Sequence, residues 1–410
     1  MVTLAGMRAL SVPWSLLAIF SASLLLPAIM RAAESKSPLA AQFQPVLDDH
    51  LVAGAVALVG SEDKVLDVEA MGYADIAARR PMTPDTLFWI ASMTKAITGT
   101  AMMMLIDEGE VGIDDPVGKY LPEFKGQMLA VEQDQDHIVL RKPGSPIRIR
   151  DLLTHTSGLT AHTPLEDRID RLSLDDNVAV YPLIPLRFPR GEKYEYSNAG
   201  INTAGRIVEV VSGLPFEEFL RQRLFAPLGM KDTTFWPNPE QLARLAKSYQ
   251  PNADKSGLEE IRIEQLSYPL SDRHRGACPA GGLFSTAEDV YRFCRMVGQG
   301  GTYAGRRYLS RAAVDQMTAT QIGDLPMPPS PNLDYGYGFG WLTRRKMERI
   351  NEPVNLGTFG AGGAYNTNMW INRPRHLITV WMVQQSGFSE AQRSRVRNTL
   401  MKAAVAAFGQ

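Results

Sequence analysis

The chain has few cysteines and almost no net charge, and each shortage excludes a class of protein. Only Cys278 and Cys294 occur among 410 residues, too few for a disulfide scaffold or a zinc cluster. The two could pair in an oxidising compartment or remain buried thiols. A formal net charge of −1 gives no electrostatic reason to expect nucleic acid or an anionic membrane surface as a partner.

Several catalytic patterns are also missing. The sequence has no Gly-x-Ser-x-Gly elbow, which argues against an α/β-hydrolase. It also lacks His-Glu-x-x-His, a phosphate-binding loop and a clean dinucleotide fingerprint. We therefore expect no metal ion and no cofactor. The remaining composition, 45% hydrophobic and 21% charged, is that of an ordinary globular protein.

The N-terminus has the pattern of a targeting segment. Arg8 precedes an uncharged stretch at residues 9–30, and small residues follow before the chain turns polar. This pattern predicts a secretory signal within residues 1–33, cleaved near residues 28–33, and hence a periplasmic or secreted protein. The alternative is an uncleaved membrane anchor, since the apolar stretch approaches spanning length. No cysteine lies near its end, which argues against a lipoprotein.

Strand-like segments lie towards both ends of the mature chain, with helix-like segments between them. Strands are predicted at residues 52–59, 65–70, 337–341, 365–371 and 377–383. Helices are predicted at residues 38–51, 202–211, 215–225 and 390–408, and a solvated loop at 131–137. The order indicates an α+β fold with one sheet from residues 38–91 and 275–410 and a mainly helical insertion at 92–274.

The most informative motif is Ser92-Met93-Thr94-Lys95. A serine hydroxyl needs an adjacent base to become a nucleophile, and residues three apart on a helix share one face. A second match, Ser61-Glu62-Asp63-Lys64, lies between two strand-like runs and is predicted to form a hairpin turn. After Ser92, apolar residues recur at helical spacing as far as Gly109. Only Ser92 is therefore expected to have the helical geometry.

Two further motifs could complete such a site. Tyr196-Ser197-Asn198 lies in a loop before a helix, and a phenol beside a lysine ammonium is favoured in its ionised form, so Tyr196 could carry a proton. Gly360-Ala361-Gly362-Gly363-Ala364 precedes a strand. Small residues there allow a substrate backbone to approach closely, and a free N–H can face a developing oxyanion.

In order and spacing, these three motifs resemble those of the serine β-lactamase and penicillin-binding protein superfamily, in its class C-like branch. The resemblance covers nearly all of residues 36–410 and implies an antiparallel sheet flanked by N- and C-terminal helices. Three further stretches carry it, for which largely structural roles are implied: Leu152-Leu153-Thr154-His155-Thr156-Ser157-Gly158-Leu159, Phe225-Ala226-Pro227-Leu228-Gly229-Met230 and Ala280-Gly281-Gly282-Leu283-Phe284-Ser285-Thr286. For His155, a structural hydrogen bond is favoured over a role as catalytic base.

The resemblance implies a role for each matching residue. Ser92 would attack an acyl carbonyl and form an acyl-enzyme, Lys95 would activate Ser92, and Tyr196 would serve as general acid and base. Asn198 would orient Lys95 or a substrate amide. The oxyanion would be held by the backbone N–H groups of Ser92 and Ala364, beside Gly362 and Gly363.

One position departs from the family pattern. The third motif usually begins with lysine or histidine, and Ala361 stands there. The missing cation would contact a substrate carboxylate, so we expect a neutral ester or amide substrate, unless Arg273 or Arg275 supplies the charge. Three hypotheses remain: an esterase-type serine hydrolase, a D-Ala-D-Ala carboxypeptidase-like peptidase or β-lactamase, and a catalytically weakened binding protein with the same fold. The natural substrate and the oligomeric state are left open.

Overall fold

The centre of the fold is an eight-stranded antiparallel sheet whose strands come from both ends of the chain. The computed structural model describes residues 37–161, 163, 167–327, 335–345 and 356–409, so the predicted leader at 1–33 lies outside the described residues. In spatial order the strands are β12 (Tyr335–Tyr337), β13 (Leu342–Arg344), β14 (Thr358–Gly362), β15 (Asn368–Asn372), β16 (Leu377–Met382), β1 (Gly54–Gly60), β2 (Val65–Asp75) and β3 (Arg80–Pro81).

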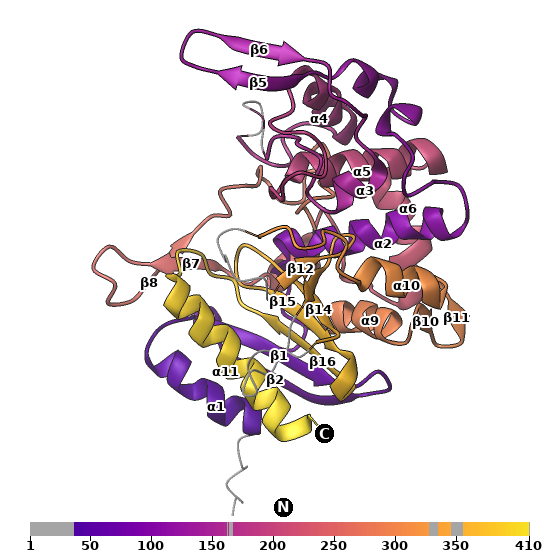
Figure 1. Cartoon of the computed structure of the whole chain (residues 1–410). Helices are drawn as coiled ribbons and strands as arrows, with labels where there is room; N and C mark the ends of the chain where they lie inside the picture. Colours follow the sequence, from indigo (N-terminus) through magenta and orange to yellow (C-terminus); the bar gives the residue numbers. More distant parts are fainter. Residues whose placement is uncertain (1–36, 162, 164–166, 328–334, 346–355, 410) are drawn as a thin grey trace, which may run out of the picture. The chain divides into compact units, whose positions relative to one another are not determined.

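Both faces of the sheet are buried, which the alternation along β1 shows. Ala55, Ala57 and Val59 belong to the core cluster that includes residues of the terminal helices α1 (Pro38–Asp48) and α11 (Glu390–Phe408). Val56 and Leu58 belong to the larger cluster on the other face. Successive strand residues point to opposite faces, so one strand contributes to two cores. Figure 1 shows α1 and α11, in indigo and yellow, side by side against the sheet.

The remaining helices and hairpins complete the fold. The larger core cluster, to which Val56 and Leu58 belong, includes residues of α2 (Thr94–Asp107), α9 (Ala287–Gly298) and α10 (Arg311–Thr318). Helix α9 packs against β1, β15 and β16. The intervening chain forms α3 (Ile149–Leu153), α4 (Leu174–Val180), α5 (Asn198–Ser212), α6 (Phe216–Leu220), α7 (Ala226–Leu228) and α8 (Pro239–Arg244). Short antiparallel pairs are β4 (Phe88–Trp89) with β9 (Phe284–Ser285), β5 (Leu129–Gln133) with β6 (Ile138–Arg141), β7 (Ser248–Pro251) with β8 (Leu258–Ile261), and β10 (Thr302–Tyr303) with β11 (Arg306–Arg307).

The α+β fold with a central antiparallel sheet is as predicted, and three local expectations need correction. The strand expected at 337–341 ends at Tyr337, because residues 338–340 turn to pack against α2: a Cβ on Gly340 would lie 2.5 Å from the carbonyl oxygen of Lys95. The strand expected at 365–371 begins only at Asn368, after a turn in which Asn366 has φ 68°. The loop expected at 131–137 is largely the exposed β5–β6 hairpin.

The question of whether the two cysteines pair has a structural answer. Cys278 and Cys294 are both buried thiols and do not form a disulfide with each other. Burial raises the pKa of the Cys294 thiol far above its ordinary value. Within the described residues, no helix combines the length and the apolar character needed to cross a membrane.

Candidate active site

Ser92 lies in a short 3₁₀ turn, Ala91–Met93, between β4 and α2. The preceding residue, Ala91, has φ 44°, in the left-handed region that a non-glycine residue rarely adopts. Such a conformation costs on the order of 1–3 kcal/mol and persists where the surroundings impose it. Here the Thr94 hydroxyl donates to the Ala91 carbonyl oxygen at 2.6 Å. This turn places Ser92 immediately before the first turn of α2.

The structure brings Lys95 into contact with Ser92. Lys95 Nζ lies 3.1 Å from Ser92 Oγ, and the Lys95 side chain is only 1% exposed. The same ammonium donates to the carbonyl oxygen of Ala280 at 2.5 Å. By contrast, Ser61 Oγ accepts from the backbone N–H groups of Asp63 and Lys64 at 3.1 and 3.2 Å, as in a turn. The two Ser-x-x-Lys matches therefore differ in local geometry as their surroundings predict.

The loop that carries Ala280 is tied to two helices. Asn202 on α5 accepts from the backbone N–H of Ala280 at 3.0 Å through its side-chain oxygen. Thr98 on α2 donates to the carbonyl oxygen of Pro279 at 2.7 Å. No chemical role was predicted for Asn202 from the sequence. A possible signal was its position, one helical turn after Asn198 in an otherwise apolar stretch.

Tyr196 lies against Lys95 with the face of its ring. Lys95 Nζ is 4.7 Å from the ring centroid, within cation–π range. Tyr196 is 40% exposed, and among the described residues no hydrogen bond joins its hydroxyl to Ser92 or Lys95. Asn198, the first residue of α5, is half-buried, and within the same part of the chain no hydrogen bond joins it to Lys95. Its predicted role towards a substrate amide thus stays a prediction.

His155 holds the segment that carries Tyr196. Its Nδ1 accepts from the backbone N–H of Ser197 at 3.1 Å, which leaves the proton of the neutral ring on Nε2. The His155 ring centroid lies 4.5 Å from that of Tyr196 and 4.7 Å from that of Tyr337. Burial, and secondly the charge of Lys95, holds the pKa of His155 well below its ordinary value. These contacts describe a neutral, buried acceptor for the backbone of the Tyr196 loop.

The third motif abuts the segment before Ser92. β14 ends at Gly362, and Gly363 donates its N–H to the carbonyl oxygen of Thr367 at 2.7 Å. The Thr367 hydroxyl in turn donates to the carbonyl oxygen of Ile90 at 3.3 Å. A Cβ on Gly363 would lie 2.5 Å from that same Ile90 oxygen, so only glycine fits there. Ala364 follows and is exposed.

Ala361 is 6% exposed and belongs to the core cluster that α2 also enters. The two arginines suggested as substitute cations differ in their surroundings. Arg275 is buried and forms an ion pair with Asp170 at 2.6 Å. The Arg273 guanidinium lies 4.8 Å from the ring centroid of Trp236. The expectation that Arg275 could hold a substrate carboxylate is therefore wrong, because its guanidinium is already paired inside the protein.

Comparison with known proteins places this geometry in a family. Residues 39–403 match the family model described as Beta-lactamase. The chain is 33% identical over 364 residues to protein Rv1367c of Mycobacterium tuberculosis, covering 84% of this chain and 88% of that protein. It is 29% identical to esterase EstB of Burkholderia gladioli, covering 83% and 88% of the two chains. Among solved structures, simvastatin synthase LovD from Aspergillus terreus shares the fold with a TM-score of 0.78 at 21% identity, covering 92% of this chain and 100% of that one. The chain belongs to the β-lactamase family.

Proposed function

We propose that this protein is a serine hydrolase that forms an acyl-enzyme on Ser92 and acts on neutral esters. The observation that carries the proposal is the buried contact of 3.1 Å between Lys95 Nζ and Ser92 Oγ. A lysine amine within hydrogen-bond reach of a serine hydroxyl can take up its proton as the oxygen attacks. The printed name of the relative EstB, an esterase, supports the same class of reaction.

The geometry supports a two-step acyl transfer. In its neutral form, Lys95 would donate one N–H to the Ala280 carbonyl oxygen and keep its lone pair for the Ser92 proton. As the Ser92 oxygen bonds to the ester carbonyl carbon, that proton would pass to Lys95. The ester C–O bond would break, and the leaving alkoxide would take a proton through the Tyr196 hydroxyl. Water would then cleave the acyl-enzyme by the reverse proton path and release the carboxylic acid.

The oxyanion would be held by the backbone N–H groups of Ser92 and Ala364. The two segments that carry these groups are in direct contact, because Thr367 and Gly363 pack on the carbonyl of Ile90. Preorganised donors of this kind are worth about 10²–10³-fold in rate each.

The preference for neutral substrates rests on Ala361. An alkyl side chain there cannot pair with a substrate carboxylate, and a hydrogen bond to a charged group contributes about 1.5–3 kcal/mol. Arg275 does not replace the missing cation, because it is paired with Asp170. β-lactams and D-alanyl peptides carry such a carboxylate, so the alternative peptidase or β-lactamase activity is expected to be weaker than ester hydrolysis.

The test is covalent labelling read by intact mass. The wild-type protein should gain one fluorophosphonate adduct, and Ser92→Ala should gain none. Ser61→Ala should label like the wild type, because Ser61 belongs to the other Ser-x-x-Lys match, in the turn between β1 and β2. Hydrolysis of nitrophenyl acetate, compared with that of a chromogenic cephalosporin, then separates ester from β-lactam specificity. If the wild-type protein takes up no acyl mass from any ester or β-lactam, the chain is a binding protein with this fold.

Export is a further part of the proposal. It rests on the sequence of residues 1–33 alone. We expect the protein recovered from outside the cytoplasm to begin between residues 29 and 34, after cleavage near residues 28–33. N-terminal sequencing of that protein would show an intact leader if the segment instead remains as an anchor.

A further inference from the structure

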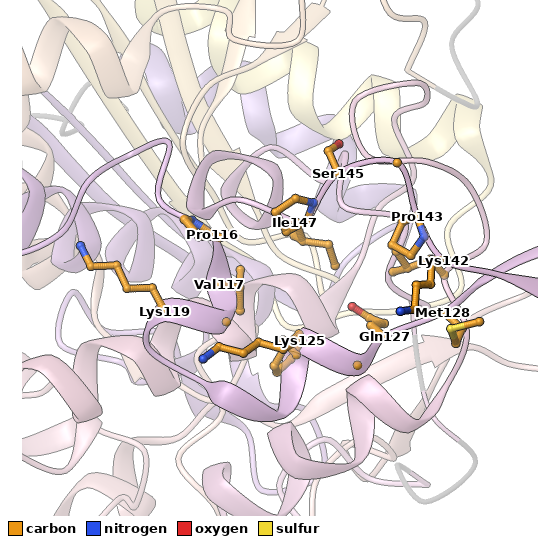
Figure 2. A pocket seen from close by; sticks show the side chains of 16 residues that line it. Pro116, Val117, Lys119, Lys125, Gln127, Met128, Lys142, Pro143, Ser145 and Ile147 are labelled. Carbon is orange, nitrogen blue, oxygen red and sulfur yellow. The ribbon is translucent and has the colours of Figure 1, made fainter.

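A cavity lies at the base of the β5–β6 hairpin, away from Ser92. It has a volume of about 490 Å³ and is formed by residues 116–119, 124–128 and 142–147 together with Leu186. Figure 2 shows its lining side chains. Neither Ser92, Lys95 nor Tyr196 lines it. The volume lies within the range of about 300–1,000 Å³ that is usual for small-molecule pockets.

The lining carries an excess of positive charge. Lys119, Lys125 and Lys142 all line the cavity, and no aspartate or glutamate does so. Lys119 is paired with Asp115 at 2.7 Å. Across the described part of the chain, no carboxylate lies within ion-pair distance of Lys125 or Lys142. The charge of the pocket therefore favours an anion.

A buried amide in the same lining also lacks a partner. Gln127 is only 6% exposed, and its amide nitrogen is buried without a hydrogen bond. Its amide oxygen has no protein donor among the described residues either, so a half turn of the amide would present N–H to the cavity without breaking a bond. An unsatisfied buried polar group is destabilising, and a ligand oxygen that accepted from this amide would remove that cost. Elsewhere in the lining, Ser145 Oγ accepts from Arg190 Nε at 2.8 Å, which leaves the hydroxyl proton free to donate to a ligand.

The rest of the lining is apolar. Phe124, Met128, Ile147 and Leu186 contribute side chains of the kind that cover hydrocarbon. A free inorganic anion would leave these walls without a partner, whereas an organic anion with an apolar body would cover them. From this combination we propose that the cavity is a binding site for a small amphipathic organic anion, whose carboxylate or phosphate head lies near Lys142 and Gln127.

The proposal does not depend on the proposed hydrolase activity and is tested by binding. We would titrate hexanoate, hexyl phosphate and 1-hexanol into the Ser92→Ala protein by calorimetry, so that the catalytic serine plays no part. At least one of the two anions should bind with a stoichiometry of one, and hexanol should bind at least about tenfold more weakly, because it lacks the charge. The tighter of the two anions identifies the head group.

Two variants and one control locate the site. Lys142→Met should weaken binding of the anion by about 10- to 100-fold, while Lys64→Met, at the exposed β1–β2 turn, should leave it unchanged. Gln127→Leu should weaken anion binding and at the same time raise the melting temperature of the free protein, because it removes the unpartnered amide. The proposal is overturned if neither anion binds, if hexanol binds as tightly as the anions, or if binding is the same in Lys142→Met and Gln127→Leu as in their parent.

Discussion

Asn202 is linked to Lys95 through one residue, Ala280: the Asn202 side-chain oxygen accepts the N–H of Ala280, and the carbonyl of Ala280 accepts from Lys95. The other end of the same amide donates to the hydroxyl of Tyr181 at 2.9 Å. A side chain on α5 thus fixes the direction of the carbonyl that orients Lys95. Without touching Ser92, it contributes to where the Lys95 amine is held.

Replacing Asn202 should therefore slow catalysis more than it weakens substrate binding. In Asn202→Ala the N–H of Ala280 loses its acceptor, and the Lys95 amine loses a fixed partner. We expect kcat for nitrophenyl acetate to fall by about tenfold, equivalent to about 1.4 kcal/mol, with little change in KM. Tyr181→Phe is the matched control, because it removes the other partner of the same amide. An equal fall of kcat in both variants would mean a general loss of packing.

The roles of the Tyr196 ring and the Tyr196 hydroxyl can be tested separately. Tyr196→Phe keeps the ring over Lys95 but removes the proposed proton carrier, so kcat should fall by about 10²–10⁴-fold. Tyr194→Phe is the control, since Tyr194 is buried and meets the His155 ring edge-on at 5.7 Å. The measurement is kcat from steady-state kinetics. A near-normal kcat in Tyr196→Phe would mean that Tyr196 only packs against Lys95 and carries no proton.

The lowered pKa of His155 leads to a prediction about how the free energy of unfolding depends on pH. Its folded pKa lies well below the ordinary 6.5, so below pH 6.5 the unfolded chain binds a proton that the native protein does not. The free energy of unfolding should then decrease as the pH falls from 6.5, by up to about 1.4 kcal/mol per pH unit. In His155→Asn this contribution disappears, while the asparagine oxygen can still accept from Ser197.

Urea titrations of the wild type and His155→Asn between pH 5 and 7.5 measure the difference. Asp289, whose pKa is raised to about 6 by burial, titrates in both proteins and cancels in the comparison. His155→Phe, which cannot accept from Ser197, should lose both stability and kcat, and His155→Asn should recover much of each. Parallel pH profiles for the two proteins would contradict the assignment of a buried neutral imidazole.

The substrate preference can be tested at Ala361. Ala361→Lys should raise the ratio of kcat/KM for a carboxylate-bearing cephalosporin to that for nitrophenyl acetate by about tenfold or more, the lower end of what one charged hydrogen bond supplies. Ala361→Met, of similar length and uncharged, controls for the added bulk at this largely buried position. An unchanged ratio in the lysine variant would show that the third motif does not select the substrate charge.

The parts of the fold that were predictable are those with a local signal. The last helix begins and ends where expected, at residues 390 and 408, because Ser389 and Gln392 form a capping box and the apolar residues follow helical spacing. Ser92 could be distinguished from Ser61 by the pattern around each. These features depend on residues that are close together in the sequence.

The rest depends on contacts between distant segments. The carbonyl of Ala280 is a backbone group, so its bond to Lys95 has no residue-specific sequence signal. The strand predicted at residues 337–341 stops early because Phe339 and Gly340 must fit closely against Gly99 and Lys95 of α2. The β5–β6 hairpin was missed because its strands are exposed on both faces and lack the alternation that marks a half-buried strand.

The order of the strands has a consequence for biosynthesis. β1 pairs on one side with β2, its neighbour in the chain, and on the other with β16, more than 300 residues later. A nascent polypeptide can form the β1–β2 hairpin early, but the sheet stays open until the final strands have left the ribosome, and contacts of such long sequence separation form slowly. A chain truncated before β14 would carry Ser92, Lys95 and Tyr196 yet lack the strands that bury α1 and complete the third motif. Premature termination or C-terminal proteolysis should thus yield an inert fragment rather than a partly active hydrolase.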